Sequence, residues 1–300
     1  MVTYRLGERE ARLGVLHRDL VVDASRLARQ QQCELPAGML EFIDLGQQGT
    51  LLLQALLQDS GPRELAGAST FAGNVTLLAP IPRPRKNIFG IGLNYAKHVE
   101  ESARSLDTAA QRPDKPVIFS KPPTSVVSWC DPIIHNRAVT EQLDWETELA
   151  VIIGRRASRI DRSAAMDFVF GYSVINDISA RDCRRSGQWI VSKGQDSFAP
   201  MGPCIVTSDE IPDPHDLRLY TKVNGVVKQD SNTRHMLFRI DELIADISSV
   251  MTLEPGDIIA TGTPDGVGAG RTPPEFMWPG DVLESAVEPI GTLRNPIVAA

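Results

Sequence analysis

A chain of 300 residues is long enough for one large domain, or for a large domain with a small one, and it can bury most of its apolar surface. The net charge of −7 at pH 7, with basic residues scattered along the chain, argues against nucleic-acid binding, and no apolar run is long enough to span a membrane. Because the N-terminus has no apolar signal core and the four cysteines form no Cys-x-x-Cys pair, we expect a cytoplasmic protein with reduced thiols and no zinc site.

The first 78 residues are expected to form a small N-terminal α/β domain without a reaction site. Residues 11–16 and 20–23 have the pattern of a hairpin, and 49–58 that of a short helix. The proline-rich segment 80–85 can neither continue a helix nor lie in a central strand, so it is interpreted as a linker. We therefore predict domains at 1–78 and 79–300.

The larger domain has the pattern of a β-rich unit with few helices. The hairpin at 217–229 has the turn Asn224-Gly225, which favours type I′. Strands and helices do not alternate as βαβ units, and Gly90-x-Gly92 lacks the third glycine of a dinucleotide-binding fingerprint. We therefore expect an α+β, β-rich roll. The other predicted elements are strands at 88–93, 117–120, 143–154, 170–177 and 257–262, helices at 94–101, 163–168 and 241–250, and a loop at 193–203.

The segment 143–154 carries two carboxylates and is predicted as one strand stopped by Gly154. On a strand, Glu146 and Glu148 share one face, about 6–7 Å apart. Two carboxylates this close, leading into an apolar run, resist desolvation unless a cation lies between them, and hard oxygen ligands suit Mg²⁺, Mn²⁺ or Ca²⁺. Solvated glutamates at a wet strand end explain the segment equally well. From these residues alone both interpretations stay open.

Three further features point to chemistry, and each has a plainer alternative. His98 and Glu101 are i, i+3 neighbours on a predicted helix, so the carboxylate could orient the imidazole to activate water, although surface helices commonly carry such a pair. Asp177 ends a predicted strand, where it is either a metal ligand or the cap of a helix at 179–185. Lys193 lies in the predicted loop and either supports an oxyanion or is solvated.

Taken in order, these pieces resemble the fumarylacetoacetate hydrolase family over essentially all of residues 80–297. Within that family the chain is similar to bacterial acylpyruvate hydrolases and 2-hydroxyhepta-2,4-diene-1,7-dioate isomerases. The matching motifs are Gly92-Leu93-Asn94-Tyr95 with His98 and Glu101, Phe119-Ser120-Lys121-Pro122-Pro123, Asp144-Trp145-Glu146-Thr147-Glu148-Leu149, Asn176-Asp177-Ile178-Ser179-Ala180-Arg181-Asp182, Lys193 with Asp196-Ser197-Phe198-Ala199-Pro200, Val223-Asn224-Gly225, Leu253-Glu254-Pro255-Gly256-Asp257, and Thr261-Gly262-Thr263-Pro264-Asp265-Gly266-Val267-Gly268.

The resemblance implies a mixed β-sandwich roll, paired in a homodimer, that acts on a small 2-oxo acid. It implies Mg²⁺ or Mn²⁺ as cofactor, with Ca²⁺ as a stand-in in crystals. It also implies that His98 and Glu101 lie on a lid that orders when substrate binds, and the polar composition of residues 102–115 makes this segment a candidate for that lid. The implied roles are metal binding by Glu146, Glu148 and Asp177, catalysis by His98, Glu101 and Lys193, and substrate binding by Arg181, Thr263, Tyr95 and Lys121.

One position departs from the family pattern. Seven residues after the aspartate ligand, members often carry a substrate-binding glutamine, whereas this chain has Arg184. Unless Gln188 substitutes for that glutamine, the pocket is expected to be more cationic and to favour a second carboxylate on the substrate.

The residue types and the resemblance together predict hydrolysis of a C–C bond in an acylpyruvate-type 2,4-dioxo acid. His98, oriented by Glu101, would take a proton from water, and Lys193 would support the oxyanion. The same residues also serve decarboxylation or tautomerisation of oxaloacetate, and isomerisation or decarboxylation of 2-oxo acids from aromatic or sugar-acid catabolism. These reactions stay as alternatives. A metal-bound binding module without catalysis would not need all three catalytic residues.

Overall fold

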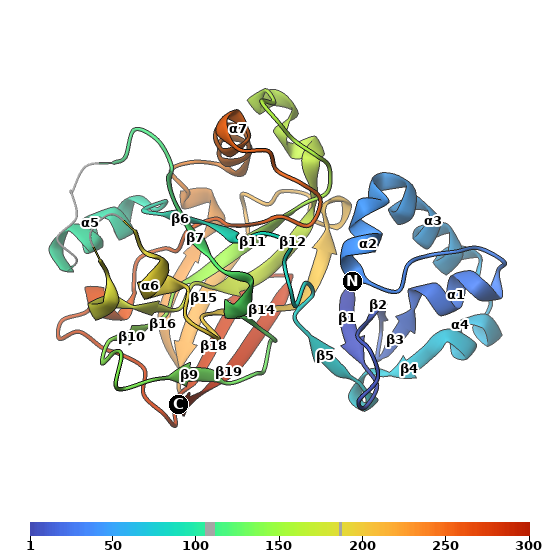
Figure 1. Ribbon diagram of the computed structural model, residues 1–300, viewed down its shortest axis with the longest axis horizontal. Helices are drawn as coiled ribbons and strands as arrows, with labels where there is room; N and C mark the ends of the chain where they lie inside the picture. The colour runs from blue at the N-terminus through green and yellow to red at the C-terminus, as the bar shows by residue number, and fades with distance from the viewer. Residues whose placement is uncertain (106–111, 186–187) are drawn as a thin grey trace.

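The computed structural model describes residues 1–105, 112–185 and 188–300, which form a smaller N-terminal lobe and a larger C-terminal one (Figure 1). The N-terminal lobe is an antiparallel sheet in the order β4-β3-β2-β1-β5 with helices packed on it. The hairpin expected in this lobe is confirmed as β2 and β3. The elements are β1 (Val2–Arg5), β2 (Arg12–His17), β3 (Leu20–Asp23), α1 (Ala24–Gln30), α2 (Met39–Asp44), α3 (Gly46–Asp59), α4 (Pro62–Ala68), β4 (Ser69–Phe71), η1 (Ala72–Asn74) and β5 (Thr76–Leu78).

The larger lobe is built on two curled sheets, in the orders β7-β6-β17-β11-β12-β14-β8 and β16-β15-β18-β19-β9, with the short pair β10-β13 beside them. Most pairs are antiparallel, whereas β6 with β17, β8 with β14 and β9 with β19 are parallel. The predicted α+β, β-rich class is confirmed. The strands are β6 (Ile88–Gly92), β7 (Val117–Lys121), β8 (Val126–Val127), β9 (Ile133–His135), β10 (Leu143–Asp144), β11 (Thr147–Ile153), β12 (Val169–Asn176), β13 (Ser179–Ala180), β14 (Ala199–Thr207), β15 (Arg218–Val223), β16 (Val226–Asn232), β17 (Ile258–Ala260), β18 (Val282–Val287) and β19 (Gly291–Ala299).

Helices in the larger lobe are few and mostly short. Positive φ angles at Asn224 and Gly225 confirm the predicted turn between β15 and β16. The predicted helix at 163–168 is a 3₁₀ helix instead. The helical elements are α5 (Ala96–Ser105), α6 (Ile190–Lys193), α7 (Ile240–Val250), η2 (Pro123–Ser125), η3 (Arg162–Phe168), η4 (Arg181–Cys183), η5 (Ser208–Glu210), η6 (Thr233–His235) and η7 (Gly268–Gly270).

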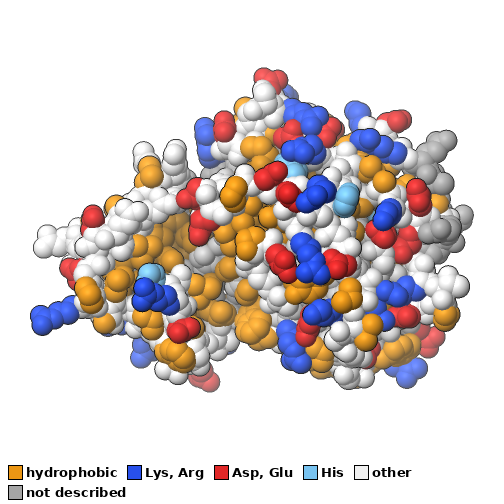
Figure 2. All heavy atoms as spheres, turned by 180° about the vertical axis from the view of Figure 1, so that it is seen from behind, with side chains coloured by type: hydrophobic (Ala, Val, Ile, Leu, Met, Phe, Trp, Pro, Cys, Tyr) orange, Lys and Arg blue, Asp and Glu red, His pale blue; other side chains and the backbone are white. Residues whose placement is uncertain are grey.

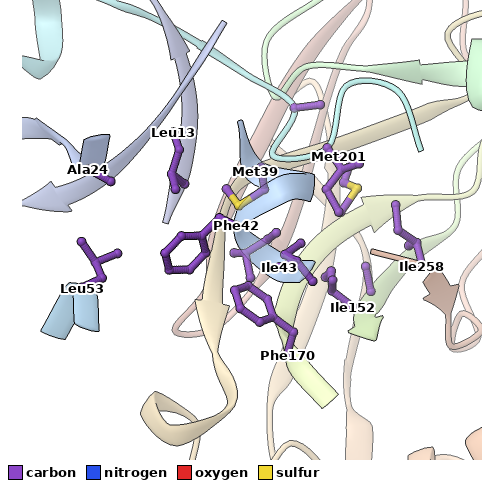
Figure 3. Close-up of a cluster of buried hydrophobic side chains, with 14 of the residues drawn as sticks. Leu13, Ala24, Met39, Phe42, Ile43, Leu53, Ile152, Phe170, Met201 and Ile258 are labelled. Carbon is purple, nitrogen blue, oxygen red and sulfur yellow. The ribbon is translucent and has the colours of Figure 1, made fainter. Parts of the chain in front are cut away.

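One hydrophobic cluster runs from the N-terminal lobe into the larger lobe. Phe42 of α2 packs edge-on against Phe170 of β12, with ring centroids 6.4 Å apart. Ile152 of β11 and Met201 of β14 belong to the same cluster, which Figure 3 shows in close-up. Because this cluster spans both lobes, the division of the chain at residue 78 stays a prediction.

A second cluster fills the larger lobe, where alternate residues of β11 reach it. Leu149 and Val151 point into this cluster, while Ala150 and Ile152 face the one shared with the N-terminal lobe. Both faces of β11 are therefore buried, which explains its nearly continuous apolar sequence.

Charged side chains of both signs are interspersed over the larger lobe on the face shown in Figure 2, and hydrophobic side chains gather toward the N-terminal lobe. Among the described residues, no helix is both long and apolar enough to cross a membrane.

Candidate active site

Two neighbouring strands bring three carboxylates together. Glu148 lies in β11, Glu146 directly precedes that strand, and Asp177 directly follows β12. The antiparallel register sets Thr147 opposite Asn176, and the Asp177 backbone N–H donates to the Glu146 carbonyl over 2.8 Å. One carboxylate oxygen from each acidic residue lies within 4.8 Å of the others, and all three side chains are buried.

The charge on Glu148 is the least compensated of the three. Its Oε2 accepts a hydrogen bond of 2.8 Å from the Gly262 backbone, but Oε1 is buried and has no hydrogen-bond partner among the described residues. Burial, followed by the charges of Asp177 and Glu146, raises its pKa well above the ordinary value. A buried acidic cluster with an orphaned oxygen and an all-oxygen donor set fits Mg²⁺ or Mn²⁺.

Two buried lysines flank Asp177. The Lys193 ammonium donates to Glu146 Oε2 and Ser179 Oγ, at 2.9 Å each, and also to Asp177. Lys121 lies 2.5 Å from the other oxygen of Asp177 and donates to the Lys193 carbonyl. Burial alone would raise the pKa of Glu146, but Lys193 and Arg181 lower it by more, so its pKa falls below the ordinary range and it is held as an anion.

Arg181 connects the carboxylate cluster to Asp144. Its Nη2 lies 2.7 Å from Glu146 Oε1, and its Nε donates to Asp144 over 2.8 Å. Asp144 is fully buried and also accepts from the backbone N–H groups of Gly268 and Ala269, at 2.6 and 3.0 Å. A glycine-rich segment therefore fixes Asp144, and Asp144 fixes the guanidinium.

Helix α5 brings the histidine–glutamate pair to the same site. His98 Nδ1 lies 3.3 Å from Glu101 Oε2, and Ser102 Oγ lies 3.5 Å from the other ring nitrogen. The Glu101 carboxylate also accepts from the Gly266 N–H, at 3.0 and 3.2 Å to its two oxygens. Both members of the pair are buried, unlike an incidental pair on a helix surface.

Of these groups, His98, Glu146, Arg181 and Lys193 line one pocket. The Thr263 side chain donates to the Thr147 carbonyl over 3.0 Å and accepts from Gln229 over 2.8 Å, so its position is fixed on both sides. The lining residues are Ile91, Gly92, Leu93, His98, Ser102, Glu146, Arg181, Arg184, Trp189, Ser192, Lys193 and Thr263.

Residues 87–298 match the model of the fumarylacetoacetate hydrolase C-terminal domain. The chain belongs to the fumarylacetoacetate hydrolase family. Oxaloacetate tautomerase YisK of Bacillus subtilis is 40% identical over 289 residues, which are 93% of this chain and 95% of that protein. The mitochondrial oxaloacetate tautomerase fahd2 of Xenopus laevis is 41% identical over 267 residues, or 88% and 79% of the two chains.

Two solved structures share the fold over the whole chain. A fumarylacetoacetate hydrolase from Exiguobacterium antarcticum gives a TM-score of 0.82 at 36% identity and covers 100% of this chain and 99% of that one. Maleylpyruvate hydrolase from Sphingobium sp. SYK-6, in complex with manganese(II) and pyruvate, gives 0.78 at 28% identity, with 100% and 98% covered.

Three side chains expected at the substrate lie off the pocket of this family member. Lys121 is fully buried behind Asp177, so its role there is to hold a carboxylate. Tyr95 is buried with its hydroxyl unpartnered among the described residues, and burial together with the charge of Glu148 raises its pKa. Gln188 is exposed and does not line the pocket, whereas Arg184 does. Of the expected lid, residues 106–111 lie outside the described residues.

Local structure at two positions differs from the prediction. The expected strand at 143–154 is broken at Trp145 and Glu146, where the chain passes from β10 to β11. The break lets the Glu146 N–H donate to the Asn176 side chain instead of a strand partner. The loop expected at 193–203 is also wrong, because Lys193 ends helix α6 and residues from 199 onward lie in β14. The helix considered at 179–185 is β13 followed by a 3₁₀ turn.

Asp144, Trp189 and Ser179 take part in the site although their side chains were not predicted to do so. Asp144 lies two residues before Glu146 in the same acidic motif, and this spacing is the signal that could have identified it. Trp189 and Ser179 gave no comparable signal, because an isolated tryptophan or serine is ordinary in any fold.

Proposed function

We propose that the protein is a metal-dependent enzyme that interconverts the keto and enol forms of oxaloacetate. The observation that carries the proposal is the buried cluster of Glu146, Glu148 and Asp177, of which Glu146 lines a pocket together with His98 and Lys193. The choice of oxaloacetate is supported by the relatives, because oxaloacetate tautomerases at about 40% identity align over most of this chain.

In this proposal the three carboxylates hold Mg²⁺ or Mn²⁺, which, when bound, would act as a Lewis acid on the 2-oxo group of the substrate. His98 takes the proton from C3 of the keto form, and Glu101 keeps the imidazole oriented for that transfer. The electron pair of the broken C3–H bond forms the C2–C3 double bond, and the 2-oxo oxygen becomes the enol hydroxyl by accepting a proton. Lys193 is the buried donor for that oxygen.

Arg181 binds the substrate's 1-carboxylate in this arrangement. Its guanidinium lines the pocket and is held on one side by Asp144. The planar guanidinium suits recognition of a carboxylate, and its fixed orientation lowers the entropy lost on binding. The apolar wall made by Ile91 and Leu93 limits water around C3, which protects the enolate from unwanted protonation.

The test follows the decay of the enol absorbance of oxaloacetate with Mg²⁺, with Mn²⁺ and with chelator. We expect a metal-dependent acceleration that is lost in Glu148→Gln and falls by about 10²- to 10⁴-fold in His98→Gln. The matched control is His17→Gln, which changes an exposed histidine of β2 and should leave the rate unchanged. A rate with chelator equal to the rate with metal would overturn the proposal.

Hydrolysis of an acylpyruvate is the second candidate, favoured by the fold shared with maleylpyruvate hydrolase and by the buried His98–Glu101 pair. In that reaction His98 takes a proton from water instead of from C3. Maleylpyruvate, acetylpyruvate and oxaloacetate should therefore be compared with product analysis. Release of pyruvate together with a carboxylic acid identifies hydrolysis, whereas consumption of the oxaloacetate enol without release of pyruvate identifies tautomerisation.

A further inference from the structure

We propose that Arg184, stacked on Trp189, binds the distal carboxylate of the substrate and thereby selects dicarboxylic 2-oxo acids. This inference rests on the proposed function for the position of the 2-oxo acid end, and it adds the residue that recognises the other end.

The pocket has a buried floor and an exposed mouth. Glu146 and Lys193 form the floor, where their side chains are 6% and 7% exposed. Arg184 is exposed and Trp189 half-buried, and both line the same pocket. A substrate with its reacting end on the floor therefore directs its far end toward Arg184.

Trp189 forms a fixed platform at the mouth. Its ring lies 5.4 Å from the Phe119 ring, at an interplanar angle of 44°. It also packs over Gly92 so closely that a Cβ at that position would lie 2.6 Å from the indole. The absence of a side chain at Gly92 therefore lets the Trp189 indole pack directly against the end of β6.

The Arg184 guanidinium lies 4.6 Å from the Trp189 ring centroid. A stacked guanidinium uses its face, while its N–H donors lie in the plane and point sideways, where they can bind a carboxylate in a bidentate manner. Arg181 and Lys193 also line the pocket, but they lie at its floor, within 2.9 Å of Glu146. Among the described lining residues, Arg184 is the arginine at the mouth.

The experiment makes two measurements with Mg²⁺ present. The first compares, by calorimetry, the binding of malate and 2-hydroxybutanoate, which differ by the distal carboxylate. The second is the split between KM and kcat for oxaloacetate. In Arg184→Gln we expect malate affinity to fall and KM to rise about tenfold, with 2-hydroxybutanoate affinity unchanged and kcat nearly unchanged.

Three variants complete the test. Arg184→Lys keeps the charge but loses the planar guanidinium that stacks on Trp189, so it should recover only part of the malate affinity. Trp189→Ala should weaken malate binding in the same direction, because it removes the platform. The matched control is Arg155→Gln, since Arg155 is exposed and stacks on Phe168 at 5.0 Å, outside this pocket. This control should behave as the unaltered protein does.

The outcomes separate this inference from the proposed function. If Arg184→Gln binds malate as tightly as the unaltered protein does, or if that protein does not prefer malate to 2-hydroxybutanoate, the inference is overturned. If the Arg184-dependent preference is measured but oxaloacetate is not tautomerised, the inference stands and the proposed function fails.

Discussion

Lys193 places its ammonium nitrogen 2.9 Å from Glu146 Oε2 and also donates to Asp177, so one buried side chain neutralises two of the three clustered carboxylates. Burial lowers the pKa of Lys193, but the charges of Asp177 and Glu146 outweigh it, and the pKa is raised overall. Lys193 is therefore charged at neutral pH. A divalent cation held by the same carboxylates has to compete with it.

Replacing Lys193 with Met should strengthen metal binding and lower the stability of the metal-free protein. Without the lysine, Glu146 and Asp177 each lose one of their cationic partners, and Arg181 and Lys121 remain. The free energy of unfolding should drop by about 3 kcal/mol. Removing a positive charge next to the cation should raise the affinity for Mn²⁺ at least about tenfold. Calorimetry with Mn²⁺ and denaturant unfolding in chelator measure the two effects.

The control for this prediction is Lys86→Met. Lys86 is paired with the buried Asp257 at 2.6 Å, away from the pocket. This variant should lose stability without any change in Mn²⁺ affinity. Weaker or unchanged Mn²⁺ binding in Lys193→Met would show that the lysine and the cation do not compete.

The raised pKa of Glu148 predicts how the stability of the metal-free protein depends on pH. A carboxyl group whose pKa is higher in the folded state than in the unfolded state stabilises the fold at pH values below the unfolded-state pKa, which is 4.5 here. This stabilisation is lost as the pH rises through the folded-state pKa. In chelator, the free energy of unfolding of the unaltered protein should therefore decline above about pH 5 relative to Glu148→Gln.

The difference between the two proteins can change by at most about 1.4 kcal/mol per pH unit, because a single proton is involved. It is measured by urea unfolding at several pH values. A difference that is independent of pH would mean that Glu148 ionises normally in the folded protein. Saturating Mn²⁺ should abolish the decline, since the cation stabilises the carboxylate.

Asp144 is predicted to act as a positioning residue through Arg181. In Asp144→Asn the guanidinium loses its buried anionic partner, so KM for oxaloacetate should rise about tenfold while Mn²⁺ affinity changes little. Asp23→Asn is the matched control, because Asp23 is also buried and is paired with Arg12 at 2.5 Å in the N-terminal lobe. The control should lower stability and leave KM unchanged. Equal KM values in both variants would assign Asp144 a purely structural role.

The sequence singles out the three carboxylates, but their joint role comes from the resemblance to the family. Strand periodicity places Glu146 and Glu148 on one face and Asp177 ends a predicted strand, yet these local patterns also allow solvated glutamates and a helix cap. The hydrogen bonds that position the residues around these carboxylates could not be predicted from local patterns. Asp144 is held by Gly268, 124 residues further along the chain, and no local signal encodes that contact.

The error at 193–203 has a physical cause. The loop prediction rests on the many turn formers of the segment, among them Pro200 and Pro203, which cannot donate to a sheet ladder. In the structure β14 nevertheless pairs with β12 through Met201 and Gly202, and with β8 near Pro200. The strand conformation of this segment is therefore determined by its pairing with two other strands, and not by its local propensity.

Gly270 is predicted to control the position of Glu101. A Cβ at Gly270 would lie 2.2 Å from the Glu101 side chain, which can swing away because it is flexible. In Gly270→Ala, Glu101 should therefore leave the Gly266 N–H, and His98 should lose its orienting carboxylate. We expect kcat to fall by about 10- to 100-fold, as in Glu101→Gln, with Mn²⁺ affinity preserved.

Additivity and a control decide whether the effect passes through Glu101. Combining Gly270→Ala with Glu101→Gln should add little to either single change, because both remove the same contact. Gly61→Ala is the control, since a Cβ there meets only a Glu64 oxygen at 3.6 Å, and kcat should not change. If the double variant lowered kcat by the product of the two single effects, Gly270 would act on the reaction by a route other than Glu101. A substitution that works by displacing the Glu101 carboxylate can have no further effect once Glu101→Gln has removed that carboxylate.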